Sequence, residues 1–136
     1  MGSDEVVLRP GPDGAKLIRD LAYARAYTLR VGRTDQSYVD LDDPRRLEFD
    51  YLEQIAVVVD SCAPRGEAIR TVHIGGAAMS LARYVAATRP RSAQLVFEPD
   101  AELTAVTCRS RSGAESGCGP WTAGRAWLAF ATATPI

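Results

Sequence analysis

The sequence predicts an α/β protein in which a small N-terminal β-hairpin region precedes the first part of a parallel β-sheet. Two observations predict this fold class. Short β-prone runs separated by turn residues fill most of residues 1–43. From residue 69 onward, a strand, a glycine turn, a helix-favouring segment and a second strand follow one another, which is the order of a βαβ unit in a doubly wound sheet. We therefore divide the chain into residues 1–43, 44–106 and 107–136.

The composition argues against several classes of protein. Of the 136 residues, 46% are hydrophobic and 24% are charged, as in an ordinary globular domain. The 16 Lys and Arg nearly balance the 17 Asp and Glu, so the basic excess of a nucleic-acid-binding or membrane-surface protein is missing. No apolar run approaches the roughly 20 residues that span a bilayer. We expect a cytoplasmic protein whose partner is a small-molecule substrate, and neither a nucleic acid nor a membrane.

The N-terminal region is expected to consist of β-structure. Residues 5–10 alternate weakly and run into a cluster of proline and glycine turn formers over 10–14. Residues 26–31 and 37–41 are β-prone and flank a glycine-containing turn, which is typical of a β-hairpin. For residues 16–25 the pattern leaves strand and helix open.

The strongest local signal predicts a helix over residues 44–60. Asp43 precedes Pro44, which places an N-cap residue ahead of a first-turn proline. The apolar residues that follow are spaced for one face of a helix. They are Leu47, Tyr51, Leu52, Ile55, Ala56 and Val59. Residues 62–67 contain a proline and a glycine and are expected to be a linker.

A βαβ unit is predicted after this linker. Residues 69–74 form a strand that ends at a glycine pair, residues 77–88 favour a helix, and residues 94–97 form a second strand. Pro99 and Asp100 open a further helix. The connection between the two strands should be a right-handed crossover.

The glycine pair and the acid at the end of the second strand indicate nucleoside binding. Gly75 and Gly76 let the backbone turn tightly close to a ligand, and the amides at the start of the next helix favour a polar or anionic group. Glu98, about 20 residues further on, is placed to accept hydrogen bonds from the hydroxyls of an adenosine ribose. The alternative is that the glycines make only a turn and Glu98 caps the next helix, since the segment fails the GxGxxG pattern.

The other residues with reactive side chains are expected to be structural. His73, the only histidine, lies on a strand that should be buried on both faces, and is interpreted as a core residue. Cys62 has no base beside it, and the three cysteines form no metal-binding or disulfide pattern. Arg83 is expected to be a solvated or capping charge. The sequence therefore predicts no catalytic residue and no metal site.

Four short motifs stand in order between residues 26 and 106. They are Gln36-Ser37, Leu47-Glu48-Phe49-Asp50-Tyr51-Leu52-Glu53, Val72-His73-Ile74-Gly75-Gly76 and Val96-Phe97-Glu98-Pro99-Asp100. Together they resemble the spermidine synthase family, and most closely the spermidine-synthase-like proteins with a class I methyltransferase fold. The resemblance implies a small N-terminal β-domain followed by a Rossmann-like domain. That domain binds S-adenosylmethionine or decarboxylated S-adenosylmethionine as a substrate.

The resemblance also implies roles for six residues. Three of them would line a substrate-binding mouth, and these are Gln36, Tyr51 and Glu53. The other three would hold the nucleoside, and these are Gly75, Gly76 and Glu98, with the acid on the ribose. The implied partner is an amine or another small nucleophile, and a homodimer is left open.

The sequence departs from the family pattern at the glycine turn. The family's GGGDGG turn corresponds to residues 75–80, where Ala78 takes the place of the acid that helps to hold the aminopropyl substrate. The YHEM-type segment of the family appears as residues 51–54 with a different sequence, and the spacing from Gln36 to Glu48 is longer. These departures argue against polyamine synthesis, whereas adenosyl binding is less affected. The choice between methyl and aminopropyl transfer stays open.

The composition changes at about Thr107. Residues 107–136 hold only one of the 17 acids, Glu115, and show no sustained period until a short apolar stretch over 126–131. One interpretation is a disordered Ser/Gly-rich tail. The other is a shift of reading frame from about Cys108: 15 of the 16 basic residues are Arg, which indicates GC-rich codons, and the shifted frame resembles the missing family segment. On that interpretation the chain is a truncated, inactive copy of a transferase.

Three functions are therefore carried forward. The first is an adenosyl-dependent transferase of the spermidine-synthase-like type, in an incomplete copy. The second is a fragment of an NAD(P)-dependent oxidoreductase, against which the missing third glycine counts. The third is a non-catalytic Rossmann-type module. Titration with S-adenosylmethionine against NADH would separate the first two, and no affinity for either nucleoside would indicate the third.

Overall fold

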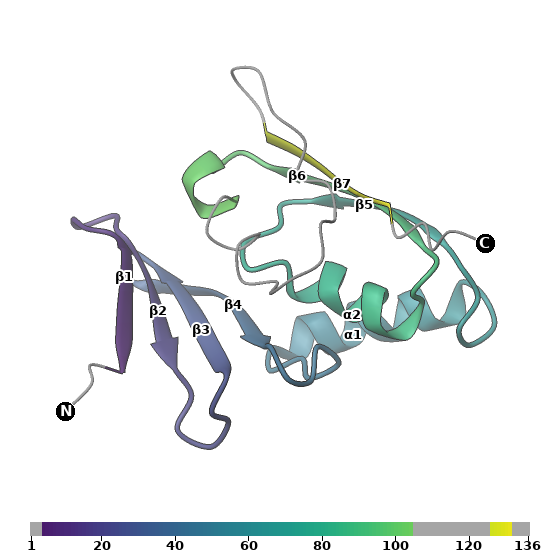
Figure 1. Ribbon diagram of the computed structural model, residues 1–136, viewed down its shortest axis with the longest axis horizontal. Helices are drawn as coiled ribbons and strands as arrows, with labels where there is room; N and C mark the ends of the chain where they lie inside the picture. Colours follow the sequence, from purple (N-terminus) through teal and green to yellow (C-terminus); the bar gives the residue numbers. More distant parts are fainter. Residues whose placement is uncertain (1–3, 105–125, 132–136) are drawn as a thin grey trace.

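The computed structural model describes residues 4–104 and 126–131, and two β-sheets lie next to each other in it (Figure 1). The first sheet has four antiparallel strands in the order β1-β2-β3-β4. Their bounds are Glu5–Arg9 for β1, Ala15–Arg19 for β2, Ala26–Val31 for β3 and Thr34–Asp40 for β4. The predicted N-terminal β-hairpin region is confirmed, and the ambiguous segment around residue 16 forms a strand.

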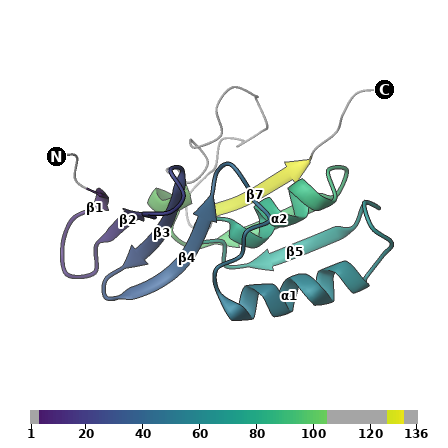
Figure 2. The ribbon, with the colours of Figure 1, turned by 90° about the horizontal axis from the view of Figure 1, so that it is seen from below.

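The second sheet has three strands in the order β5-β6-β7. β5 (Arg70–Ile74) and β6 (Ala93–Glu98) are parallel and are joined through helix α2 (Ser80–Thr88). β7 (Ala126–Ala131) pairs with β6 in the antiparallel direction. Helix α1 (Asp50–Ser61) precedes β5, and both helices lie on one face of this sheet (Figures 1 and 2). The α/β class is confirmed, in a mixed sheet whose βαβ unit is parallel.

The long helix was predicted to begin at Pro44, and this is wrong because α1 begins at Asp50. Side-chain hydrogen bonds hold the backbone before it in turns instead: Asp40 accepts from two following amides, and Asp43 accepts from the amide and the side chain of Arg45. Such bonds compete with helix formation. Leu47, which lies in this segment, is buried and packs against α1. This packing stabilises the non-helical turn relative to a longer helix.

The predicted start of the second helix, at residue 77, is also wrong. Ala77 has φ +46 and Met79 has φ +63, both in the left-handed region, so the helix begins only at Ser80. The residues between the glycine pair and α2 therefore form a tight turn. The apolar stretch in the tail forms strand β7, whereas the rest of the expected disordered or out-of-frame segment lies outside the described residues.

The two sheets share a hydrophobic core. Leu29 and Val39 of the first sheet pack with Ala78 of the turn and with Leu103, which follows β6. Polar contacts add to this interface at two places. Arg9 donates to Asp100 at 2.9 Å, and the first residue of α2 donates a hydrogen bond to β4. The two sheets are therefore held together as one unit around the residues that follow β5 and β6.

A buried arginine fastens the end of α1 to the end of α2. Arg89 is 1% exposed, and its guanidinium donates to four backbone carbonyls at 2.9 to 3.2 Å. The carbonyls belong to Asp60, Ala63, Pro64 and Glu67. Its Nε is buried without a partner. One side chain therefore binds the last turn of α1 and the linker to β5 at four backbone carbonyls.

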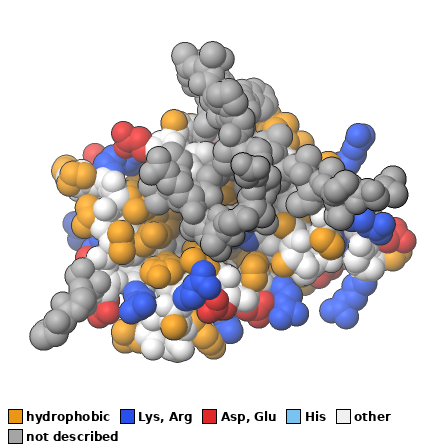
Figure 3. Space-filling model, in the orientation of Figure 1, with side chains coloured by type: hydrophobic (Ala, Val, Ile, Leu, Met, Phe, Trp, Pro, Cys, Tyr) orange, Lys and Arg blue, Asp and Glu red, His pale blue; other side chains and the backbone are white. Residues whose placement is uncertain are grey.

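Charges of both signs are interspersed on the face seen in Figure 3, with Arg and Lys side chains next to Asp and Glu. Ion pairs among the described residues include Arg30 with Asp35 and Arg46 with Asp40. Within residues 4–104 no helix is long and apolar enough to cross a membrane.

Candidate functional site

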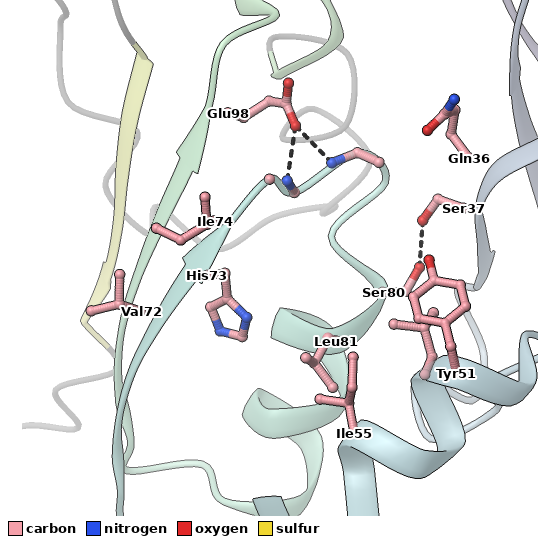
Figure 4. Close-up of a pocket in the computed structure, with 14 residues that line it drawn as sticks. Gln36, Ser37, Tyr51, Ile55, Val72, His73, Ile74, Ser80, Leu81 and Glu98 are labelled. Carbon is pink, nitrogen blue, oxygen red and sulfur yellow. Dashed lines mark hydrogen bonds between the residues drawn. The ribbon is translucent and has the colours of Figure 1, made fainter.

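A cavity of about 460 Å³ opens where β5 and β6 end, between α1, α2 and β4 (Figure 4). Crevices at the carboxyl ends of parallel strands are where α/β proteins bind their ligands, and this volume suits a small molecule. The residues that line it are Gln36, Ser37, Tyr51, Leu52, Ile55, Val72, His73, Ile74, Gly75, Gly76, Ala77, Ser80, Leu81 and Glu98.

The carboxylate of Glu98 lies directly on the glycine turn. One of its oxygens accepts hydrogen bonds from the amides of Gly76 and Ala77 at 2.8 and 2.9 Å, and the other accepts from the amide of Asp100 at 3.0 Å. Glu98 is 8% exposed. The amides of the turn thus already carry a negative group of the protein itself. This arrangement leaves little room there for the pyrophosphate of a dinucleotide.

The turn itself is conformationally tight. Gly75 has φ +85, a left-handed value that favours glycine. Gly76 is needed for a different reason, because a Cβ built there would lie 2.7 Å from Met79 Sδ and 2.8 Å from Val96 Cγ1. The glycine pair is therefore required by backbone geometry at one residue and by close packing at the next.

The structure brings together five of the six predicted site residues. Gln36 and Tyr51 line the cavity with Gly75, Gly76 and Glu98, as Figure 4 shows for the labelled side chains. The sixth residue, Glu53, lies exposed on α1 and is not among the residues that line the cavity. In a helix, residues two positions apart face in different directions, so Tyr51 and Glu53 cannot share one wall.

Sequence reasoning missed two serines that join the walls of the cavity. Ser80, the first residue of α2, donates its hydroxyl to the carbonyl of Tyr38, and its Oγ lies 2.6 Å from that of Ser37. Both serines are buried. Ser37 belongs to one of the quoted motifs, but nothing in the sequence pairs it with a residue 43 positions later.

His73 lines the cavity, and the neighbouring side chain of Gln94 fixes its tautomer. Gln94 donates its amide to the carbonyl of Ala82, so its oxygen faces His73 Nε2 at 2.9 Å. Nε2 must then carry the proton and donate it. Burial lowers the pKa of His73, although the hydrogen bond to Gln94 acts in the opposite direction. The imidazole is therefore a neutral, hydrogen-bonded member of the sheet, and the geometry gives it no base or nucleophile to act on.

The lowered pKa of His73 predicts how stability depends on pH. The unfolded chain binds a proton at the ordinary histidine pKa of about 6.5, whereas the folded chain binds it only at lower pH. The free energy of unfolding should therefore fall as pH decreases from about 7 through 6. A His73→Gln variant should lose most of this slope, which urea denaturation at a series of pH values measures.

Carboxylates also make stability depend on pH, but in a lower pH range than His73. The pKa of Asp100 is lowered, first by the hydrogen bond from the Leu103 amide, so its contribution to stability is lost only below its ordinary pKa of about 3.9. The His73 effect is therefore separable above pH 5. An unchanged slope between pH 7 and pH 5 in the His73→Gln variant would show that another group causes it.

The described residues hold no cluster of three His, Cys, Asp or Glu that could bind a metal ion. The arrangement as a whole is that of an α/β protein with a βαβ unit. A strand ends in a glycine turn, the parallel neighbour ends in an acid on that turn, and a small antiparallel sheet forms the opposite wall.

Comparison with known proteins extends this description. No protein-family model and no curated protein matches the sequence. Among solved structures, a probable spermidine synthase from Corynebacterium glutamicum is similar to this chain, with a TM-score of 0.64 and 29% sequence identity. The match covers 71% of this chain and 36% of that one. The chain therefore has a spermidine-synthase-like fold, and it spans about a third of the length of the protein that it matches.

Proposed function

We propose that this chain binds an adenosyl nucleoside in the cavity at the glycine turn, as part of a transferase of the spermidine-synthase-like type. The substrate would be S-adenosylmethionine or decarboxylated S-adenosylmethionine, and the partner a small nucleophile. The observation that carries the proposal is the position of Glu98 on the amides of Gly76 and Ala77, inside a cavity that Gln36 and Tyr51 also line. The similarity to a probable spermidine synthase supports it.

Glu98 would bind the ribose through the hydrogen-bond acceptor positions of its carboxylate that the backbone amides leave free. A carboxylate offers roughly four acceptor positions, and three amides take one each. One ribose hydroxyl could therefore add a hydrogen bond without any rearrangement, and a second would displace a backbone amide. A dinucleotide is favoured less, because its pyrophosphate would compete with Glu98 for the same amides.

The test is a Glu98→Gln variant titrated with S-adenosylmethionine by calorimetry. The neutral amide accepts hydrogen bonds more weakly and presents an NH₂ group to the turn, so we expect affinity to fall by about tenfold or more. Glu53→Gln is the matched control, since this exposed acid on α1 lies outside the cavity and its loss should leave affinity unchanged.

Circular dichroism must first show that both variants are folded. Equal affinities of the Glu98→Gln variant and the unchanged chain would contradict the assignment. Tighter binding of NADH than of S-adenosylmethionine would favour the oxidoreductase instead, and affinity for neither would favour a non-catalytic module.

Binding of a nucleoside does not by itself imply that this chain catalyses group transfer. No residue is assigned as a general base, and the shift of reading frame after Thr107 stays a prediction because most of that segment lies outside the described residues. The nucleotide sequence of the gene tests it directly. An incomplete copy would bind the nucleoside at best and show no turnover.

A further inference from the structure

We propose that two copies of this chain associate through the free edge of strand β1, in an antiparallel pair that joins their four-stranded sheets into one continuous sheet. β1 is the end strand of the order β1-β2-β3-β4, and in the described chain it pairs with β2 alone. The inference is independent of the proposed function, because β4, the two helices and the second sheet line the cavity and β1 does not.

The backbone of β1 offers hydrogen-bonding groups on its open side. The carbonyl of Asp4 accepts from the amide of Arg19 at 2.7 Å, so Asp4 faces β2. Successive residues of an antiparallel strand turn their backbone groups to alternate sides, so Val6 also faces β2 and Val7 faces outward. An open edge of this kind is a template for another strand. The amide and the carbonyl of Val7 are therefore placed to form hydrogen bonds with a second copy of β1.

Apolar side chains at this edge are exposed on both faces of the sheet. Val6 lies opposite Leu17, so the two side chains share a face, and Leu17 packs against the core that the two sheets share. Val6 is nevertheless 53% exposed, and Val7, on the other face, is 63% exposed. The hydrophobic core therefore ends short of β1. A second copy would cover both side chains, and this burial of apolar surface favours association.

The charges of β1 favour a second copy in the antiparallel orientation. The strand reads Glu5-Val6-Val7-Leu8-Arg9, with an acid at one end and a base at the other. When Val7 lies opposite its copy, Glu5 of each strand lies toward Arg9 of the other, so opposite charges meet at both ends. A parallel pair would set like charges side by side. Antiparallel pairing is also the arrangement that a two-fold axis gives, and it closes the assembly at two copies.

The space beside β1 is open to a second copy. β1 forms the outer boundary of the first sheet, and α1 and α2 lie with the second sheet (Figures 1 and 2). Glu5 and Arg9 already pair with Lys16 and Asp100 at 2.8 and 2.9 Å. All four side chains are partly exposed, so a charge of the second copy can join these ion pairs without displacing a partner.

The contact is small, which predicts a weak dimer. β1 has five residues, and its register with β2 shifts between Val7 and Arg9. An edge of this length covers less than the roughly 800 Å² per partner that is typical of a stable interface. We therefore expect the dimer to form as the protein concentration rises and to dissociate on dilution.

Sedimentation velocity of the full 136-residue chain at increasing concentration tests this inference. The weight-average sedimentation coefficient should rise toward that of a dimer. In a Val7→Pro variant the rise should disappear, because proline has no N–H to donate and its ring would face the second copy. Proline is tolerated on an edge strand where the N–H faces solvent, so circular dichroism should show that the fold persists. Val7→Thr is the matched control, since threonine keeps the amide and the branched shape and should still associate.

Amide hydrogen exchange of the unchanged chain, followed by NMR, identifies the edge in contact even if the proline variant does not fold. Exchange at the Val7 amide should slow as concentration rises. Exchange at Val72 should not change. Val72 faces the free edge of β5, because the Ile69 carbonyl and the Gly75 amide both bond to β6.

Three results would overturn the inference. The first is a sedimentation coefficient that does not change with concentration. The second is association of a folded Val7→Pro variant as strong as that of Val7→Thr. The third is exchange that slows at Val72 and not at Val7, which would assign the contact between copies to β5.

Discussion

Replacing Arg89 by methionine is expected to lower the free energy of unfolding by about 3 kcal/mol or more. The guanidinium is almost fully buried and donates to one carbonyl in the last turn of α1 and to three in the segment that links α1 to β5. Methionine fills similar space but donates nothing, so four hydrogen bonds to a charged group are lost, each worth about 1.5 to 3 kcal/mol. Asp60, Pro64 and Glu67 are exposed, so water can replace part of this loss. Urea denaturation measures the difference.

Two further variants separate hydrogen bonding from charge. Arg89→Lys keeps the positive charge but loses the planar fork of donors, so its stability should lie between those of the methionine variant and the unchanged chain. Arg91→Met removes an exposed arginine two residues away and should change stability by less than about 0.5 kcal/mol. If Arg89→Met and Arg91→Met were equally stable, the hydrogen bonds of Arg89 to the four carbonyls would not contribute to stability.

A Gly76→Ala substitution should destabilise the fold by about 1 to 3 kcal/mol and should also weaken nucleoside binding. The new methyl group would lie within 2.8 Å of side-chain atoms of Met79 and Val96. Met79 is flexible and can move, but Val96 is fully buried and branched in the central strand. The backbone must therefore shift, and it carries the amide that donates to Glu98.

Gly66→Ala is the control for this substitution. Gly66 has φ +78 with open space around it, so alanine there costs only the strain of a left-handed residue, about 1 to 2 kcal/mol. Binding of S-adenosylmethionine should be weakened by Gly76→Ala and unaffected by Gly66→Ala. Similar binding in both variants would show that the turn tolerates movement at Gly76.

The sequence predicts well those features that depend on neighbouring residues. The hairpin, the strand before Gly75 and the strand that ends on Glu98 follow from local runs of β-prone residues and turn formers. The contact between Gly76 and Glu98 was also predictable, because parallel strands of a βαβ unit bring their ends together.

Features that depend on distant residues were not predictable. Asp43 and Pro44 have the form of a helix start, yet the packing of Leu47 and the hydrogen bonds of Asp40 prevent it. The four carbonyls bound by Arg89 lie 22 to 29 residues earlier in the chain, and nothing in their sequence marks them. The orientation of Glu53 is different, because the helical period alone places it on another side of α1 than Tyr51; the resemblance to the family, and not the residue pattern, had put both in one wall.

The contact between Ser37 and Ser80 bears on how a ligand would enter. Ser80 begins the helix that follows the nucleoside turn, and its hydroxyl is bonded to the strand that carries Gln36. The opposing walls of the cavity are thus fixed to each other before any ligand arrives, which is preorganisation rather than closure around a substrate. Binding should then require little ordering of the backbone, so its heat-capacity change would reflect the apolar surface covered by the ligand and little else.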